Sequence, residues 1–207
     1  RRLRGVGRRQ AGDWLSANMR GEMAGGQSVG FSVRKEDKGQ RFNVIAGDAG
    51  GIARALGLYP DARGGTMLLS FLLPGPDEPD DTIIGNLRAD NFRIVKAKVL
   101  TRLLTLGSLT GLSDTLNDKG ITFTRLTVPF TMRKRILHIE RARAVGPALA
   151  IIATGDYARD GEVLGFQGAI VPSYSINSVL GVIPILGELL IGRKGEGVFA
   201  FTYKVDG

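Results

Sequence analysis

The sequence predicts a mainly β fold of the α+β class, in which an antiparallel sheet is interrupted by helical insertions. Three observations predict it. Apolar and polar residues alternate in short segments along most of the chain, as in strands with one buried face. The 30 glycines and only 8 prolines follow no tight repeat, which favours many turns between short strands. Apolar residues spaced three or four positions apart are confined to a few stretches.

A β-hairpin is predicted over residues 28–44, followed by a short helix. Val29 and Phe31 alternate with small or polar residues on the first arm, and a charged turn separates this arm from the second. Asp48 can accept hydrogen bonds from the first free amides of a helix near residues 49–56. A glycine follows this stretch directly, and glycine commonly ends a helix.

Further strands are predicted on both sides of a long helical stretch. A strong strand at residues 66–73 stops at an acidic, proline-bearing loop, and its partner covers residues 83–95. Alternation returns after residue 120 and continues almost to the end of the chain. These later strands cover residues 121–131, 136–144, 148–157, 163–171 and 199–205.

Residues 97–117 and 175–191 are predicted to be amphipathic helical insertions. In the first, leucines recur every three or four residues with polar residues between them, as at Leu103 and Leu106. The second contains the apolar run 179–191, which at 13 residues is shorter than a bilayer span of about 20. This run therefore indicates a pair of core helices, an edge cap or an interfacial segment.

The charge pattern favours solvated surface charge over nucleic-acid binding. The chain has 28 Lys and Arg against 20 Asp and Glu, a net charge of +8. The basic clusters lie at residues 1–9 and at residues 133–135, a predicted hairpin tip, and neither contains interleaved aromatic side chains that could stack on bases. We expect residues 1–12 to be a frayed basic segment, and residues 13–207 to form a single domain that is a segment of a longer protein.

The sequence contains no recognisable catalytic, metal-binding or cofactor-binding set. The absence of cysteine removes thiol nucleophiles and cysteine-bound zinc. The single histidine, His138, lies on a predicted strand and is interpreted as a satisfied or surface imidazole. The acidic loop 77–81 lacks the ligand spacing of a calcium loop, and residues 187–194 depart from a phosphate-binding loop after the second glycine. We therefore expect a protein that is not an enzyme and that uses no cofactor.

Several strings, found in order along the chain, resemble one known family. They are DAGGIARALGLY at 48–59, RGG at 63–65, LLTLGSLTGLS at 103–113, KGITFTRL at 119–126, GPAL at 146–149, VPSYSINSVLG at 171–181, IPILG at 183–187 and GEGVFA at 195–200. Together they resemble the AsmA-like C-terminal region of bacterial envelope proteins, of the YhdP type within the AsmA/TamB superfamily. The resemblance covers about residues 13–207. The chain departs from it in the proline-rich loop 74–81 and at residues 133–135, where the family usually has an acidic or glycine-bearing turn.

The resemblance implies a curved, taco-shaped β-groove with an apolar lining. Members of the family are anchored in the inner membrane of Gram-negative bacteria by an N-terminal helix and extend through the periplasm. They are associated with moving phospholipid toward the outer membrane and with keeping that membrane a barrier. The expected ligand is therefore phospholipid or another acyl-chain compound, and the expected partners are a membrane surface or an envelope protein, with the parent chain's anchor outside this sequence.

Two sets of apolar residues are candidates for these roles. The groove-lining candidates are Val29, Phe31, Leu69, Phe71, Phe123, Ile151, Phe199 and Phe201. The candidates for capping the groove, or for contacting a membrane or a partner, are Leu103, Leu106, Leu109, Leu180, Ile183, Leu186, Leu189 and Leu190. The same alternation also fits an ordinary packed core. The alternative function is therefore a structural or protein-interaction module of the envelope, with a sealed core and no lipid channel.

Overall fold

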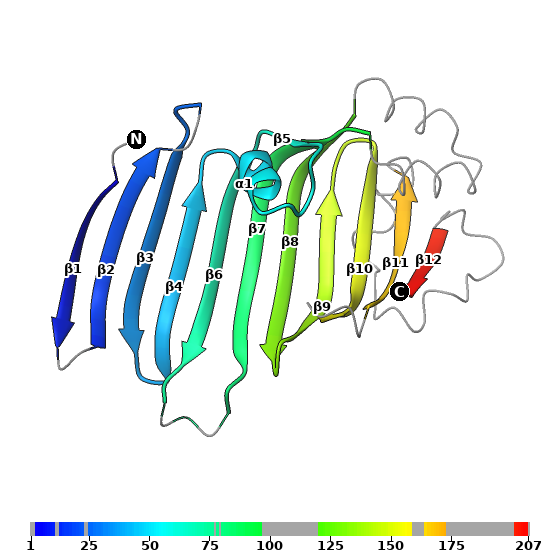
Figure 1. Ribbon diagram of the computed structural model, residues 1–207. Helices are drawn as coiled ribbons and strands as arrows, with labels where there is room; N and C mark the ends of the chain where they lie inside the picture. Colours follow the sequence, from blue (N-terminus) through cyan, green and yellow to red (C-terminus); the bar gives the residue numbers. More distant parts are fainter. Residues whose placement is uncertain are drawn as a thin grey trace.

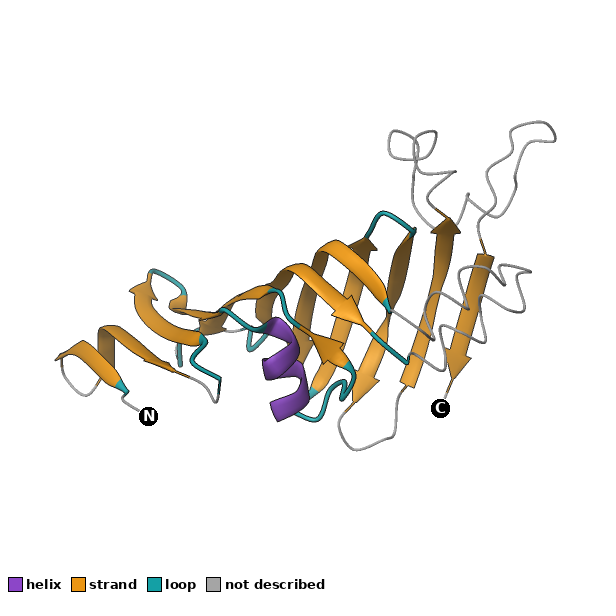
Figure 2. Cartoon of the chain, turned by 90° about the horizontal axis from the view of Figure 1, so that it is seen from above, coloured by secondary structure: helices purple, strands orange, loops and turns teal. Residues whose placement is uncertain are grey.

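The computed structural model describes residues 3–10, 13–22, 25–76, 78, 80–96, 120–158, 164–172 and 201–206. These residues form a mainly β structure, with one open antiparallel sheet of twelve strands and a short helix, α1 (Figure 1). The strands lie side by side in chain order, except that β5 pairs with β7 off the main path. Seen from above, the sheet is twisted and curved along its length (Figure 2). The fold class predicted from the sequence is confirmed.

Strands β1, β2 and β5 were not predicted, and the other strands match the predicted pattern with small shifts at their ends. In the first half they are β1 (Arg4–Gln10), β2 (Asp13–Glu22), β3 (Ser28–Glu36), β4 (Gly39–Ala46), β5 (Ala62–Arg63), β6 (Thr66–Pro74) and β7 (Ile83–Ile94). In the second half they are β8 (Ile121–Arg133), β9 (Ile136–Val145), β10 (Leu149–Ala158), β11 (Leu164–Pro172) and β12 (Phe201–Asp206). Helix α1 covers Ala49–Ala55.

The N-terminal residues correct one expectation. The basic segment before residue 13 was expected to be frayed, but β1 pairs with β2 along its whole length, from Arg4↔Arg20 onward. Glycines hide the alternation of this strand in the sequence. The structure needs a glycine at Gly7, because a Cβ there would clash with a ring carbon of Trp14.

The two predicted helical insertions, near residues 97–117 and 175–191, lie outside the described residues. All of the capping candidates fall within them, so these predictions stay open. Within the part of the chain that the structure describes, no helical segment has the length and the apolar character needed to span a bilayer.

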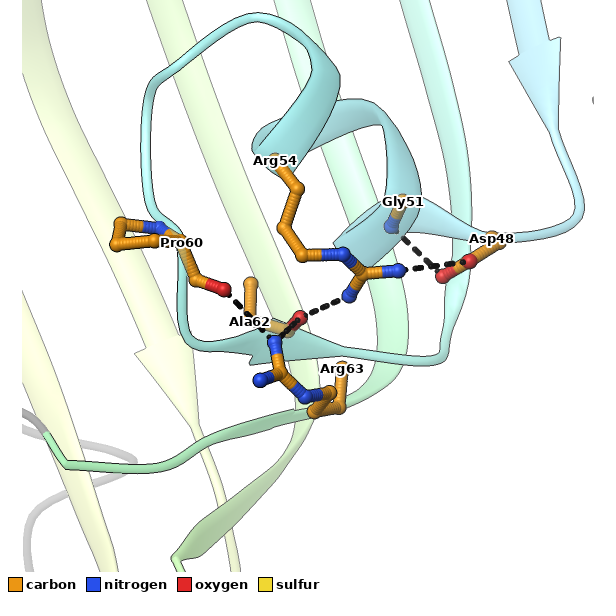
Figure 3. Close-up of polar contacts among 6 residues, drawn as sticks. All are labelled: Asp48, Gly51, Arg54, Pro60, Ala62 and Arg63. Atoms are coloured by element: carbon orange, nitrogen blue, oxygen red, sulfur yellow. Dashed lines mark hydrogen bonds and ion pairs between the residues drawn. The ribbon is translucent and has the colours of Figure 1, made fainter. Parts of the chain in front are cut away.

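Helix α1 is fixed to the sheet by its polar ends (Figure 3). As predicted, Asp48 caps it: the carboxylate accepts a hydrogen bond of 2.8 Å from the Gly51 amide. Arg54, in the last turn, donates to the Asp48 carboxylate and to the Ala62 carbonyl of β5. A Cβ at Gly50 would lie 2.7 Å from the backbone of β5. The close approach of helix to strand therefore requires glycine at this position.

One face of the sheet is apolar along rows of cross-strand partners, whose side chains share a face. One row consists of Val29, Ala46, Met67, Ala89, Leu126, Ala144, Ile151 and Ile170. A second row consists of Ala17, Val33, Phe42, Phe71, Gly85, Phe130, Ile139, Gly155 and Phe166. We call the side that carries these rows the apolar face and the opposite side the outer face.

The backbone of β7 is irregular at Asn91. Asn91 has a φ of 55°, and the register of β7 with β8 is the same on its two sides, with the pairs Asp90↔Arg125 and Phe92↔Phe123. Phe92 shares a buried cluster with Ala89, which lies three positions earlier in the strand. The rings of Phe92 and Phe123 stack with their centroids 5.3 Å apart.

Helix α1 seals one end of the apolar face. Ala49 of the helix belongs to the same buried cluster as Phe123, Leu149 and Ile170. Phe123 and Leu149 are 0% exposed, and Ile170 is 1% exposed. We call this cluster, which spans β7 to β11, the sealed part of the apolar face.

Candidate functional site

The apolar face is not sealed over its whole area. On β1 to β4, away from the buried cluster, a hollow of about 460 Å³ opens on this face. Its lining residues include Leu3, Trp14, Met19, Phe31, Val33 and Phe42. Trp14 remains 41% exposed and Met19 37% exposed. We call this region the open part of the apolar face.

Three phenylalanines in contact, one pair of rings tilted and the other stacked, link the hollow to the middle of the sheet. Phe31 and Phe42 lie on the adjacent strands β3 and β4, with ring centroids 5.8 Å apart. Phe42 and its cross-strand partner Phe71 on β6 stack almost in parallel, 5.1 Å apart. Aromatic rings give large apolar area with few rotatable bonds, so this ladder forms a rigid floor for the open part.

The edge of the hollow is formed by the only tryptophan in the chain. The Trp14 ring lies over Gly7 of the neighbouring strand, where a Cβ would meet it. The guanidinium of Arg9 lies 4.8 Å from the centre of the same ring. A cation therefore stands next to the apolar surface at this edge of the sheet.

Of the predicted groove residues, Phe31 lines the hollow, whereas Val29, Leu69 and Phe71 are not among its lining residues. Val29, Phe31, Leu69 and Phe71 lie on strands β3 and β6 and are partly exposed. Ile151 packs against the buried cluster, outside the open part.

Two further groove candidates lie near or beyond the limit of what the structure describes. Phe199 lies outside the described residues, and Phe201 is described only by its backbone register opposite Ile170. The prediction that Phe123 lines the groove is wrong. Its side chain is 0% exposed, belongs to the buried cluster that also contains Ala49 of α1, and lines no open surface.

Sequence reasoning missed several residues of the hollow. Trp14 and Met19 lie on β2, a strand that was not predicted. Val33 and Phe42 fall within the predicted hairpin over residues 28–44, but they are not among the predicted groove residues. The sequence does contain a sign of this strand, because Trp14, Ser16 and Asn18 alternate with Leu15, Ala17 and Met19. The alternation is not regular in the structure, since the register of β1 with β2 shifts between Arg8 and Arg9.

The outer face is mostly polar and carries the single histidine. His138 Nδ1 lies 2.6 Å from a carboxylate oxygen of Asp156, its direct cross-strand partner, and both side chains are about half exposed. The interpretation of His138 as a surface, satisfied imidazole is confirmed. Among the described residues, no three His, Asp or Glu side chains are placed to hold a metal ion together.

A second polar cluster on the outer face is expected to make stability depend on pH. Asp90 accepts hydrogen bonds from Arg125 at 2.8 Å and from Arg88 at 2.7 Å, and these bonds hold the pKa of the Asp90 carboxyl below its usual value. Because the folded-state pKa is lowered, this stabilisation is complete above the unfolded pKa near 4 and is lost as pH falls through the folded value. Replacing Asp90 with Asn should lower the free energy of unfolding at pH 7 by less than about 1 kcal/mol.

The measurement is urea unfolding at pH 7 and pH 3. Asp90→Asn should show a smaller loss of stability between these two pH values than the wild-type chain. Arg125→Gln removes one of the two hydrogen-bond donors to Asp90, so it should also reduce the loss of stability between pH 7 and pH 3, but by less. An unchanged pH dependence in both variants would show that these bonds do not contribute to folding.

The chain was compared with known families, proteins and structures. No protein-family model, no curated protein and no solved structure matches it. The function is therefore inferred from the geometry of the sheet.

Proposed function

We propose that this chain is a non-catalytic segment of a lipid-transfer or envelope-biogenesis protein, in which the open part of the apolar face holds the acyl chains of a phospholipid. The observation that carries the proposal is the hollow on β1 to β4, with its apolar lining and its partly exposed Met19 and Trp14. An apolar surface left accessible on one continuous face marks a binding site more often than a chance exposure.

The energetics favour an acyl chain as the ligand. Each methylene group removed from water contributes about 0.8 kcal/mol, so even a short length of chain on the phenylalanine ladder binds favourably. The lining offers few hydrogen-bonding groups; Gln40 is the polar side chain among its residues. A ligand recognised at this hollow must therefore be mostly hydrocarbon.

The setting of this activity follows from the resemblance to AsmA-like envelope proteins. We place the segment in the periplasm, on a parent protein anchored in the inner membrane by a helix outside this chain. Phospholipid would move along the sheet toward the outer membrane, and the predicted insertions at residues 97–117 and 175–191 would cap the groove or contact a membrane or an envelope protein.

The sealed part supports a second candidate function. Phe123, Ile121 and Leu149 are at most 2% exposed, as in an ordinary protein core. A module in which this packed region only supports an envelope interaction would need no lipid, and its open part would be a protein-docking surface.

Lipid analysis of the purified chain separates the two candidates. The chain is incubated with phospholipid vesicles, recovered from them, and subjected to native mass spectrometry and solvent extraction. The lipid-transfer proposal predicts one or more phospholipids bound to each folded chain. A chain that emerges free of phospholipid, while keeping its circular dichroism spectrum, would favour the interaction module.

A further inference from the structure

The tip of the β8–β9 hairpin carries residues that its backbone disfavours. Arg133 pairs with Ile136, so the loop consists of Lys134 and Arg135 alone. Both have positive φ, 48° and 68°, as in a type I′ turn. This turn strongly prefers Asn-Gly, because long side chains are strained in the left-handed region. The tip therefore keeps two cationic side chains at a cost in stability.

These two cations are not neutralised within the described part of the chain. Both residues are exposed, and neither forms an ion pair with a described carboxylate. The nearby acidic residues pair with Arg133 instead. The Arg133 side chain lies 3.5 Å from the Asp81 carboxylate and 4.0 Å from the Asp80 carboxylate. The positive charge of the turn itself thus remains available to an external anion.

The turn also lies at the rim of the apolar face. Lys134 and Arg135 line a hollow of about 290 Å³ together with Ile83 and Met132, which face each other across β7 and β8. Asp81 is the acidic member of this lining. Ile83 and Met132 are in register with the apolar face, two residues beyond Gly85 and Phe130. Cationic groups therefore border an apolar surface directly.

From this combination we propose that the Lys134–Arg135 turn binds the phosphate-bearing headgroup of an anionic phospholipid whose acyl chains lie on the apolar face. The inference rests on the proposed function, which it deepens by naming the headgroup chemistry. A phosphate ester bears charge that lysine and arginine bind well, and the adjoining Ile83 and Met132 favour a ligand with an attached hydrocarbon over a free anion.

The experiment exchanges the turn for its preferred sequence. The double variant Lys134→Asn, Arg135→Gly removes both charges and relieves the strain. Its Tm should rise by about 4 °C, so loss of binding cannot come from failure to fold.

Binding is measured by co-sedimentation with vesicles of phosphatidylcholine alone and of phosphatidylcholine with phosphatidylglycerol. Binding to the anionic vesicles should fall by about 30-fold, since each cation near an anionic surface contributes about 1 kcal/mol.

A charge-matched control separates the turn from the general positive charge of the chain. Arg4→Gln, Arg20→Gln removes two exposed arginines that face each other on β1 and β2. Its binding to anionic vesicles should fall much less than that of the turn variant. An equal loss in the two variants, or no loss in the turn variant, would overturn the headgroup site.

Two further measurements distinguish the outcomes. Inorganic phosphate at millimolar concentration should not displace the wild-type chain from anionic vesicles; displacement would assign the turn to free phosphate and overturn the lipid headgroup. Uptake of phosphatidylcholine, measured separately by extraction, reports on the groove alone. If that uptake is present and the turn variant shows no defect, the headgroup site fails while the proposed function stands. If uptake is absent, the proposed function fails, and the headgroup site fails with it.

Discussion

Replacing Phe123 with alanine is expected to lower the free energy of unfolding by about 3–5 kcal/mol, far more than truncation of an exposed residue of the sheet. Phe123 is 0% exposed and stacks on Phe92, and its cluster joins α1 to strands from both halves of the sheet. Removing the ring leaves a cavity that the surrounding strands cannot fill, because their hydrogen-bonded register holds them in place. Urea unfolding followed by circular dichroism measures the difference.

The matched control is Ile84→Ala on β7. Ile84 is a large aliphatic residue on the outer face, 57% exposed, so its truncation should change stability by less than about 0.5 kcal/mol. If Phe123→Ala cost no more than Ile84→Ala, the region beneath α1 would not be a sealed core. The open groove would then extend beneath the helix.

Replacing Met19 with glutamate is expected to reduce the amount of phospholipid bound by at least about 10-fold, because a carboxylate would have to be buried against hydrocarbon. Met19 lines the hollow but is 37% exposed in the free chain, so the charge remains hydrated when no lipid is present. The fold should therefore be kept while lipid binding is lost. The measurement is phospholipid recovered per folded chain after incubation with vesicles.

Ile45→Glu introduces the same charge on the other side of the sheet. Ile45 on β4 is 52% exposed, and its neighbour Val44 is in register with the apolar face through Phe31. Because Ile45 points to the outer face, its replacement should leave lipid binding almost unchanged. Equal losses in Met19→Glu and Ile45→Glu would indicate a non-specific effect of charge and would contradict a role for the apolar face.

Much of the fold could be predicted because local signals and tertiary structure agree. Asp48 caps α1 as a helix start signal predicts, and the acidic loop before Ile83 separates two strands that do pair. The period-two alternation in β6 and β10 places Leu69 and Ile151 on the same face as expected, since side chains alternate strictly in a regular strand.

The rest depended on features that alternation cannot show. A bulge shifts the facing of every later residue in a strand, and the register of β1 with β2 shifts in this way between Arg8 and Arg9. In β7, strict alternation would place Phe92 on the face opposite to Ala89, yet both belong to one buried cluster, and Asn91 between them has a positive φ. Strand β1 was missed because Gly5 and Gly7 supply no apolar side chains, although their small size is what lets Met19 and Trp14 lie across them.

Whether a face is open or sealed also depends on contacts between distant segments. Phe31 and Phe123 both lie in alternating stretches of the sequence, yet Phe31 lines an open hollow and Phe123 is fully buried in a cluster. The cluster around Phe123 combines Ala49, from the helix that follows β4, with residues of β7, β10 and β11. No pattern within either strand contains this information.

The most direct test of the central claim uses Trp14, the only tryptophan, which lines the hollow. Its fluorescence is recorded while the chain is titrated with phospholipid brominated along the acyl chain. If hydrocarbon occupies the open part, the emission should shift to shorter wavelength and be strongly quenched, and Met19→Glu should abolish both changes. Emission that stays unshifted and unquenched in the wild-type chain, at lipid concentrations that saturate its binding to vesicles, would contradict the claim that this face holds acyl chains.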